Sequence, residues 1–239
     1  MKVHVFIPCF IDQLYPTAGF NTIKVLEKAG CEVKYNPDQT CCGQPAFNAG
    51  YWGESREVCK KLMSDFSSAE TIVVPSASCA GFVKNYYSKL FDNASNNKEV
   101  LAFQSKIYEL SDFLVNVLQV VNLGAKLDKK ATYHDSCAAL RECKIKSEPR
   151  TLLSNVMGLD LVEMADNETC CGFGGTFAVK FEDISVAMGQ QKAENVIRTE
   201  AEILISTDLS CLMHIDGVMQ MHQTKVVSMH LADVLASGY

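Results

Sequence analysis

Short apolar segments alternate along the chain with longer segments that carry apolar residues at helical spacing. Residues 3–7 are almost entirely apolar and predict a buried strand. Residues 18–29 have one apolar face and end before Gly30, so they predict a helix with a glycine cap. The same reasoning predicts strands at 31–35, 71–75, 131–134, 159–164 and 202–206, and helices at 54–68, 149–157 and 183–199.

Alternating strands and helices predict a parallel sheet with helices packed on its faces. The second half of the chain also repeats the first, since four cysteines recur in it at offsets of 128 to 132 residues. We therefore predict an α/β protein of two repeated parallel-sheet domains related by a pseudo-two-fold axis. The predicted domains are residues 1–124 and 125–239, and the polar segment 122–130 is expected to be a linker.

Charge and hydropathy exclude some classes of protein. The chain has 239 residues, and its net charge of −6 argues against nucleic acid or an anionic membrane as a partner. No apolar run approaches the roughly 20 residues that span a bilayer. The short apolar N-terminal segment is expected to be a strand, because no small-residue cleavage site follows it. We therefore expect a cytoplasmic protein.

The chain contains eleven cysteines, which is far above ordinary usage. An odd number in a chain without an export signal argues against a disulfide framework and for metal or redox chemistry. Eight of them form the two repeated sets, each with an adjacent pair followed by glycine. The sets are Cys9, Cys41, Cys42 and Cys79 in the first half, and Cys137, Cys170, Cys171 and Cys211 in the second.

In each set the thiols follow the three predicted strands, which places them at the edge where open α/β sheets bind their ligands. Four gathered thiols can ligate an iron–sulfur cluster, hold a structural zinc ion or carry out dithiol–disulfide exchange. Zinc sites usually use cysteines separated by about two to four residues. Adjacent cysteines therefore favour a multi-iron cluster, in which each can ligate a different iron atom. Gly43 and Gly172 would let backbone amides donate hydrogen bonds to sulfur.

Four segments carry a family resemblance: Cys41-Cys-Gly-Gln-Pro-Ala-Phe-Asn-Ala-Gly, His134-Asp-Ser-Cys, Cys170-Cys-Gly-Phe-Gly-Gly-Thr-Phe-Ala-Val-Lys and Cys211-Leu-Met. Over nearly its whole length the chain resembles the cysteine-rich CCG domain family. This family includes the B subunit of heterodisulfide reductase, the C-terminal part of glycolate oxidase iron–sulfur subunits, and short members made of two such domains.

The resemblance to the short members implies an iron–sulfur subunit of a complex that oxidises L-lactate to pyruvate. It implies a ferredoxin-like iron–sulfur protein and a third small subunit as partners, and no flavin on this chain. The alternative is a zinc-stabilised cysteine-rich scaffold module of the same complex, without redox chemistry of its own.

The last ligand segment departs from the family pattern. Heterodisulfide reductase domains often have Cys-x-x-Cys there, whereas this chain has Ser76-Ala-Ser-Cys79 and Asp208-Leu-Ser-Cys211. Four thiolates in each half suit one [4Fe–4S] cluster per domain, with zinc as the alternative in one site. Ser76 or Asp208 would have to supply an oxygen ligand for a fifth contact.

Other residues lie close in sequence to the second set. His134 is a candidate ligand or proton relay, although a strand-end histidine with a backbone partner is the more ordinary interpretation. Asp135, Arg141 and Lys180 could tune a cluster or bind a carboxylate, but we expect solvated surface side chains and assign none as catalytic. Three cysteines fall outside the repeat and are expected to be dispensable for metal binding: Cys31, Cys59 and Cys143.

Overall fold

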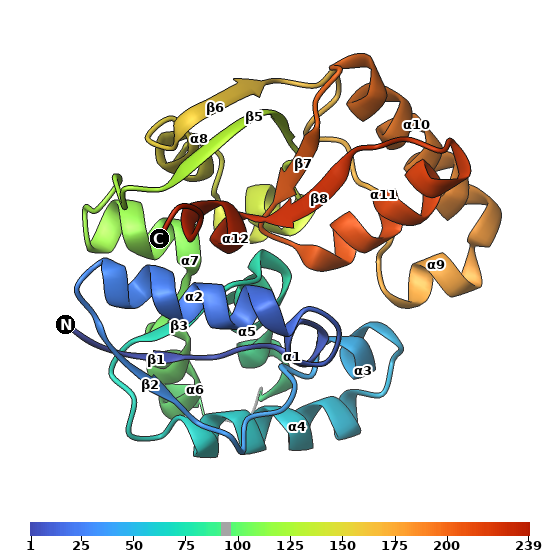
Figure 1. Cartoon of the computed structure of the whole chain (residues 1–239). Coiled ribbons are helices and arrows are strands. Elements are labelled where there is room, and N and C mark those ends of the chain that lie inside the picture. The colour runs from blue at the N-terminus through green and yellow to red at the C-terminus, as the bar shows by residue number, and fades with distance from the viewer. Residues whose placement is uncertain (92–96) are drawn as a thin grey trace.

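The computed structural model describes residues 1–91 and 97–239 and contains two four-stranded sheets (Figure 1). The first sheet has the strand order β2-β1-β3-β4, and the second has the equivalent order β6-β5-β7-β8. Every pairing is parallel, which confirms the predicted fold class of two repeated parallel-sheet units. The strands are β1 (Lys2–Val5), β2 (Glu32–Tyr35), β3 (Ile72–Val74), β4 (Ile107–Glu109), β5 (Lys126–Tyr133), β6 (Met157–Val162), β7 (Ile203–Ser206) and β8 (Val227–His230).

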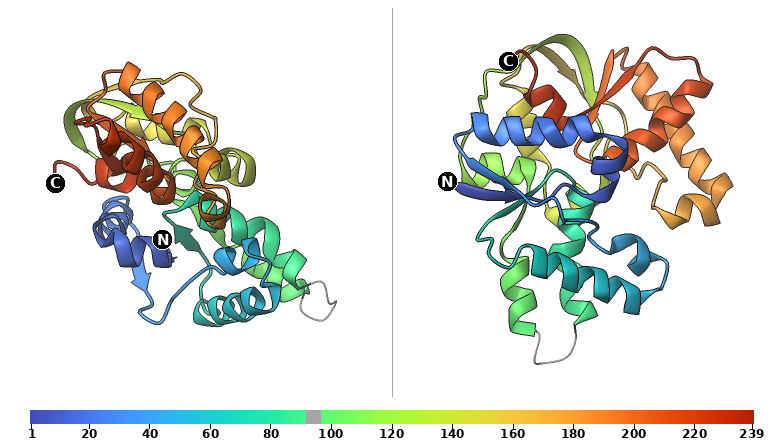
Figure 2. Two further views of the ribbon diagram at one scale, coloured as in Figure 1. Left: turned by 90° about the vertical axis from the view of Figure 1, so that its right-hand side faces the viewer. Right: turned by 60° about the horizontal axis from the view of Figure 1, so that its bottom comes forward.

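Helices connect the strands and cover the faces of both sheets (Figures 1 and 2). The first half contains α1 (Cys9–Leu14), α2 (Pro16–Lys28), α3 (Gln44–Asn48), α4 (Trp52–Asp65), α5 (Ala77–Leu90), α6 (Asn97–Gln104), α7 (Leu110–Asp112) and the π-helical turn η1 (Phe113–Val117). The second half contains the π-helical turn η2 (Ala139–Cys143), α8 (Ser147–Leu153), α9 (Thr176–Lys180), α10 (Glu182–Arg198), α11 (Leu209–Met221) and α12 (Leu231–Leu235).

Each predicted strand and helix is present with shifted bounds, but each half also has a fourth strand that was not predicted. These strands are β4, of three residues, and β8, of four. They lack the continuous apolar run that made the equally short β3 recognisable. Both strands lead directly into a short helix, α7 or α12.

The predicted linker at 122–130 is wrong in its second part, because residues 126–130 form the start of β5. The first five residues of this strand are exposed or half-buried, and only its last three are buried. Because only the last part of this strand is buried, its exposed first part has the polar composition that is typical of a linker. The domain division at residues 124 and 125 stays a prediction, with the two sheets on either side of it.

The two halves pack against each other through helices. Helix α2 lies beside α12 (Figure 1), where the Asn21 amide donates a hydrogen bond of 2.8 Å to Asp233. The turn η2 of the second half packs on α5, and a Cβ on Gly81 would lie only 2.5 Å from the Cβ of Glu142. Tyr86 donates a hydrogen bond of 3.0 Å to the Glu142 carboxylate across the same contact. This packing brings together residues that follow the strands of both sheets.

Candidate metal centres

The eight repeated cysteines lie just beyond the carboxyl ends of the strands. In the first half Cys9 begins α1 after β1, the pair Cys41–Cys42 lies between β2 and α3, and Cys79 lies in the first turn of α5. The second half repeats each position after β5, β6 and β7, with Cys137, Cys170, Cys171 and Cys211.

The sulfur atoms of the first set form a continuous chain of contacts. Cys41 is hydrogen-bonded to both Cys42 and Cys9, and the Cys42 Sγ lies 3.4 Å from the Cys79 Sγ. Gly43, with a φ of 90°, donates its backbone N–H to the Cys41 Sγ at an N–S distance of 3.4 Å. Hydrogen bonds from Cys42, from Cys9 and from this amide lower the pKa of Cys41 to about 3. Cys41 therefore favours the thiolate form that binds metals, whereas hydrogen bonds to Cys41 and burial raise the pKa of Cys9 and Cys42.

The second set repeats this arrangement. Cys170 is hydrogen-bonded to Cys137 and Cys171, and Cys171 is also hydrogen-bonded to Cys211. The Gly172 N–H donates to the Cys170 Sγ at an N–S distance of 3.4 Å. Hydrogen bonds from Cys137 and Cys171, followed by the Gly172 amide, lower the pKa of Cys170 to about 2. Each half thus brings its four predicted thiols together.

Both sets line one cavity of about 580 Å³. This common space was not predicted, because the sequence shows each set only within its own half. Aromatic rings from both halves form much of the remaining wall: Phe10, Phe47, Phe82, Tyr86 and Phe173.

The donor set fits a metal group ligated by thiolates. All eleven cysteines are free, so no disulfide competes for the eight repeated thiols. Each set combines four sulfur atoms with a glycine amide directed at one of them. An iron–sulfur cluster would be held by four thiolates in each half. The same four sulfur atoms also satisfy the ligand number of structural zinc.

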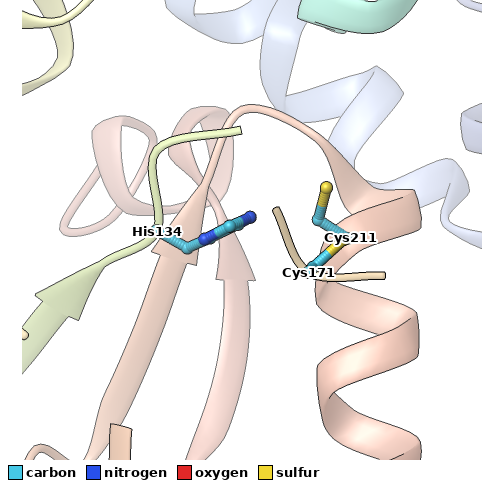
Figure 3. Close-up of side chains that lie close together, drawn as sticks. All are labelled: His134, Cys171 and Cys211. Atoms are coloured by element: carbon cyan, nitrogen blue, oxygen red, sulfur yellow. The ribbon is translucent and has the colours of Figure 1, made fainter. Parts of the chain in front are cut away.

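His134, which follows β5, adds a nitrogen donor to the second set only. Its ring reaches toward two cysteines of this set (Figure 3), and the possible ligand atoms of His134, Cys171 and Cys211 lie within 4.8 Å of one another. Neither ring nitrogen has a hydrogen-bond partner within residues 1–91 and 97–239, although the Asn167 backbone lies close by. The Asn167 backbone is the kind of partner expected for this histidine, but its contact with the ring is not a well-formed hydrogen bond. Burial, followed by the charge of Lys192, lowers the pKa of His134 to about 3, so the ring is neutral and can act as a ligand.

Asp208 links the two halves between the two sets. Its Oδ1 accepts hydrogen bonds from the Ser76 hydroxyl and the Ser78 N–H, each at 3.0 Å, and its Oδ2 accepts one from the Ser136 hydroxyl. Asp208 and Ser76 occupy corresponding positions ahead of α11 and α5. Both carboxylate oxygens are therefore engaged in bonds between structural elements, which gives Asp208 a role that the sequence did not indicate.

Asp135 is 1% exposed and forms a two-bond ion pair with Arg150, whose guanidinium also contacts Glu163. The expectation of a solvated surface side chain is wrong for Asp135, because an arginine 15 residues away compensates its buried charge. Arg141 lines the cavity, whereas Lys180 is exposed and does not contribute to its wall.

The three cysteines outside the repeat do not line the cavity. Cys31 lies in the large apolar core, and Cys59 is fully buried with its Sγ 3.6 Å from the Cys42 carbonyl oxygen. The Cys143 thiol points to the Ala77 carbonyl oxygen at 3.4 Å. That all three are dispensable for metal binding stays a prediction.

Comparison with known proteins defines the class. A family described as "CCG: Cysteine-rich domain" matches residues 3–84 and again residues 131–216. Each match contains one complete set of four thiols. The chain belongs to this cysteine-rich CCG domain family, and the match confirms the resemblance seen in the sequence.

Within that class, the chain is similar to proteins named lactate utilization protein A. It is 43% identical over 201 residues to the Bacillus pumilus protein, and the match covers 84% of each chain. It is 44% identical over 201 residues to the Halalkalibacterium halodurans protein, covering 84% of this chain and 82% of that one.

A solved structure supports the fold alone. A hypothetical protein from Helicobacter pylori superposes on the whole of this chain with a TM-score of 0.63 at 12% identity. This chain spans 49% of that protein's length. Among the described residues, no helix combines the length and the apolar composition needed to cross a bilayer.

Proposed function

We propose that this chain is the iron–sulfur subunit of a cytoplasmic complex that oxidises L-lactate to pyruvate. Each half would hold one [4Fe–4S] cluster: the first on Cys9, Cys41, Cys42 and Cys79, the second on Cys137, Cys170, Cys171 and Cys211. The observation that carries this proposal is the convergence of two complete four-thiol sets on one cavity. The names of the similar proteins supply the metabolic context.

The chain's own residues would hold and tune the clusters. Bound clusters would supply one-electron transfer. The Gly43 and Gly172 amides already donate to sulfur, and such hydrogen bonds influence reduction potential. The aromatic wall would limit the access of water to both sites. A ferredoxin-like iron–sulfur protein and a third small subunit would complete the complex.

The second candidate is a zinc-stabilised scaffold module of the same complex. One observation favours it: His134, Cys171 and Cys211 offer a compact mixed donor set in the second half. Tetrahedral zinc commonly binds such combinations of cysteine and histidine.

Anaerobic purification with iron and sulfide analysis separates the two candidates. We expect a brown protein with about eight iron and eight sulfide per chain, as two [4Fe–4S] clusters require, and an EPR signal after reduction. A colourless protein with stoichiometric zinc would contradict the proposal. Deleting the gene in its host should abolish growth on L-lactate, and the wild-type gene should restore it. Normal growth of the deletion strain on L-lactate would contradict the metabolic assignment.

A further inference from the structure

The two halves can be compared residue by residue beneath their thiol sets. The Ser55 hydroxyl donates to the Gly43 carbonyl oxygen at 3.0 Å, and the Ser185 hydroxyl donates to the Gly172 carbonyl oxygen at 2.8 Å. These matched hydrogen bonds align α4 with α10 at an offset of 130 residues. The offset of 128 between Cys9 and Cys137 aligns the ends of β1 and β5.

Under this alignment the residues below the two sets differ in polarity. His134 corresponds to Phe6, and both side chains are fully buried. Lys192 corresponds to Leu62, and these are 1% and 2% exposed. The first half therefore has two apolar side chains where the second half has an imidazole and an ammonium group.

The charge of Lys192 is held close to the second thiol set. Its ammonium donates to the carbonyl oxygens of Asp166 and Asn167, which belong to the loop that leads into Cys170. Lys192 forms no ion pair with any of the described residues. Two carboxylates act on Lys192 without forming an ion pair with it. Asp166 offsets part of its charge, and the charge of Asp135 is already compensated by Arg150. A buried cation whose hydrogen bonds go to neutral carbonyl groups retains most of its field at nearby sulfur atoms.

A cluster gains negative charge when it is reduced, so a buried cation beside it stabilises the reduced form. The unpartnered imidazole of His134 acts in the same direction, whether it ligates iron in place of a thiolate or donates a hydrogen bond to sulfur. Phe6 and Leu62 offer neither effect to the first set. Asp208 is bonded to serines of both halves, and its charge also raises the pKa of Cys137 in the second set, so it offsets part of the effect of Lys192.

Resting on the proposed function, we infer that the two clusters are not equivalent. The cluster of the second half has the higher reduction potential, because Lys192 and His134 lie beneath it. When the chain carries a single electron, that electron resides in the second half.

A redox titration followed by EPR tests this inference. The wild-type protein should show two separate one-electron waves. The Cys41→Ser variant should retain the wave of higher potential, and the Cys171→Ser variant the wave of lower potential. In the Lys192→Met and His134→Phe variants the upper wave should move down toward the lower one, while the lower wave stays in place. Leu62→Met is the matched control and should move neither wave.

Two clusters of equal potential, or retention of the lower wave in Cys41→Ser, would overturn the inference and leave the proposed function intact. These two outcomes need no substitution of Lys192, so they test the difference in reduction potential even if Lys192→Met does not fold. A chain that binds zinc at both sites and no cluster would overturn the proposed function and this inference together.

Discussion

The two halves share a sheet order and a pattern of four thiols, yet the buried and half-buried side chains around those thiols differ. Near the first set lie Phe6, Leu62 and Phe82, whereas the second half has His134, Lys192 and His214 at the corresponding offsets. His214 lies beside the Cys-Cys-Gly segment, with its Nε2 3.1 Å from the Ser185 carbonyl oxygen. Duplication has thus kept the side chains that can bind metal and the backbone that directs them. The surrounding side chains, which set the local electrostatics, have diverged.

The same divergence appears where each sheet ends. Glu109 caps α7 by accepting hydrogen bonds from the backbone N–H groups of Ser111 and Asp112. At the equivalent place before α12, His230 accepts from the Ala232 N–H through its Nδ1. Both side chains are buried, and they serve the same structural purpose with different ionisable groups.

The largest effect should come from removing one thiol in either half. Cys41→Ser and Cys171→Ser should each lose about half of the bound iron, because each set makes its sulfur contacts within its own half. Iron per chain measures this, and Cys143→Ala serves as a control that should keep all of it. If either serine variant empties both sites while the protein stays folded, the sites are shared between the halves.

The next largest effect should come from the buried ion pair found beside the second set. Arg150→Met leaves the Asp135 carboxylate buried without its partner and should cost about 3–5 kcal/mol of unfolding free energy. The first half has Ile7 at the position of Asp135 and needs no such partner. Urea unfolding measures the cost. Lys129→Met, which removes an exposed ion pair with Glu202, should cost much less. Equal costs for the two variants would show that Asp135 is better solvated than its burial indicates.

Glu109, the capping residue of the first half, predicts that the stability of the protein depends on pH. Burial raises the pKa of Glu109 from its ordinary value of 4.5 to about 7. Between these pH values the unfolded chain releases a proton that the folded chain keeps, so stability falls as pH rises from about 4.5 to about 7. The contribution lost is on the order of 3 kcal/mol.

Glu109→Gln should remove that part of the pH dependence, because glutamine can still accept the capping hydrogen bonds but does not ionise. Urea unfolding at pH 5 and pH 7.5 provides the comparison, with the exposed Glu54→Gln as the control. A Glu109→Gln profile that parallels the wild type would show that Glu109 does not titrate in this range.

The smallest effect should come from Cys59, which corresponds to Gly189 in the second half. Its thiol is fully buried in the apolar core of the first half, so Cys59→Ala should cost about 1–2 kcal/mol through lost packing. Iron content should not change. Loss of iron in this variant would make Cys59 a fifth sulfur ligand of the first set.

Much of the fold and of the thiol sets could be predicted because each cysteine follows a strand whose apolar run is visible in the sequence. The strands β4 and β8 could not, since they have no continuous apolar run like that of the three-residue β3. Lys192 has the sequence appearance of a solvated helix residue. Its burial depends on the carbonyl groups of Asp166 and Asn167, which lie about 25 residues away. The Asp208 bonds and the common cavity depend on how the halves pack, which spacing within each half does not determine.

Anomalous diffraction at the iron edge, from crystals grown without oxygen, shows directly whether each half holds its own cluster. We expect two separate iron peaks at the common cavity wall. One should lie among Cys9, Cys41, Cys42 and Cys79, and the other among Cys137, Cys170, Cys171 and Cys211. A single iron peak bridging both sets, or peaks at the zinc edge alone, would contradict this expectation.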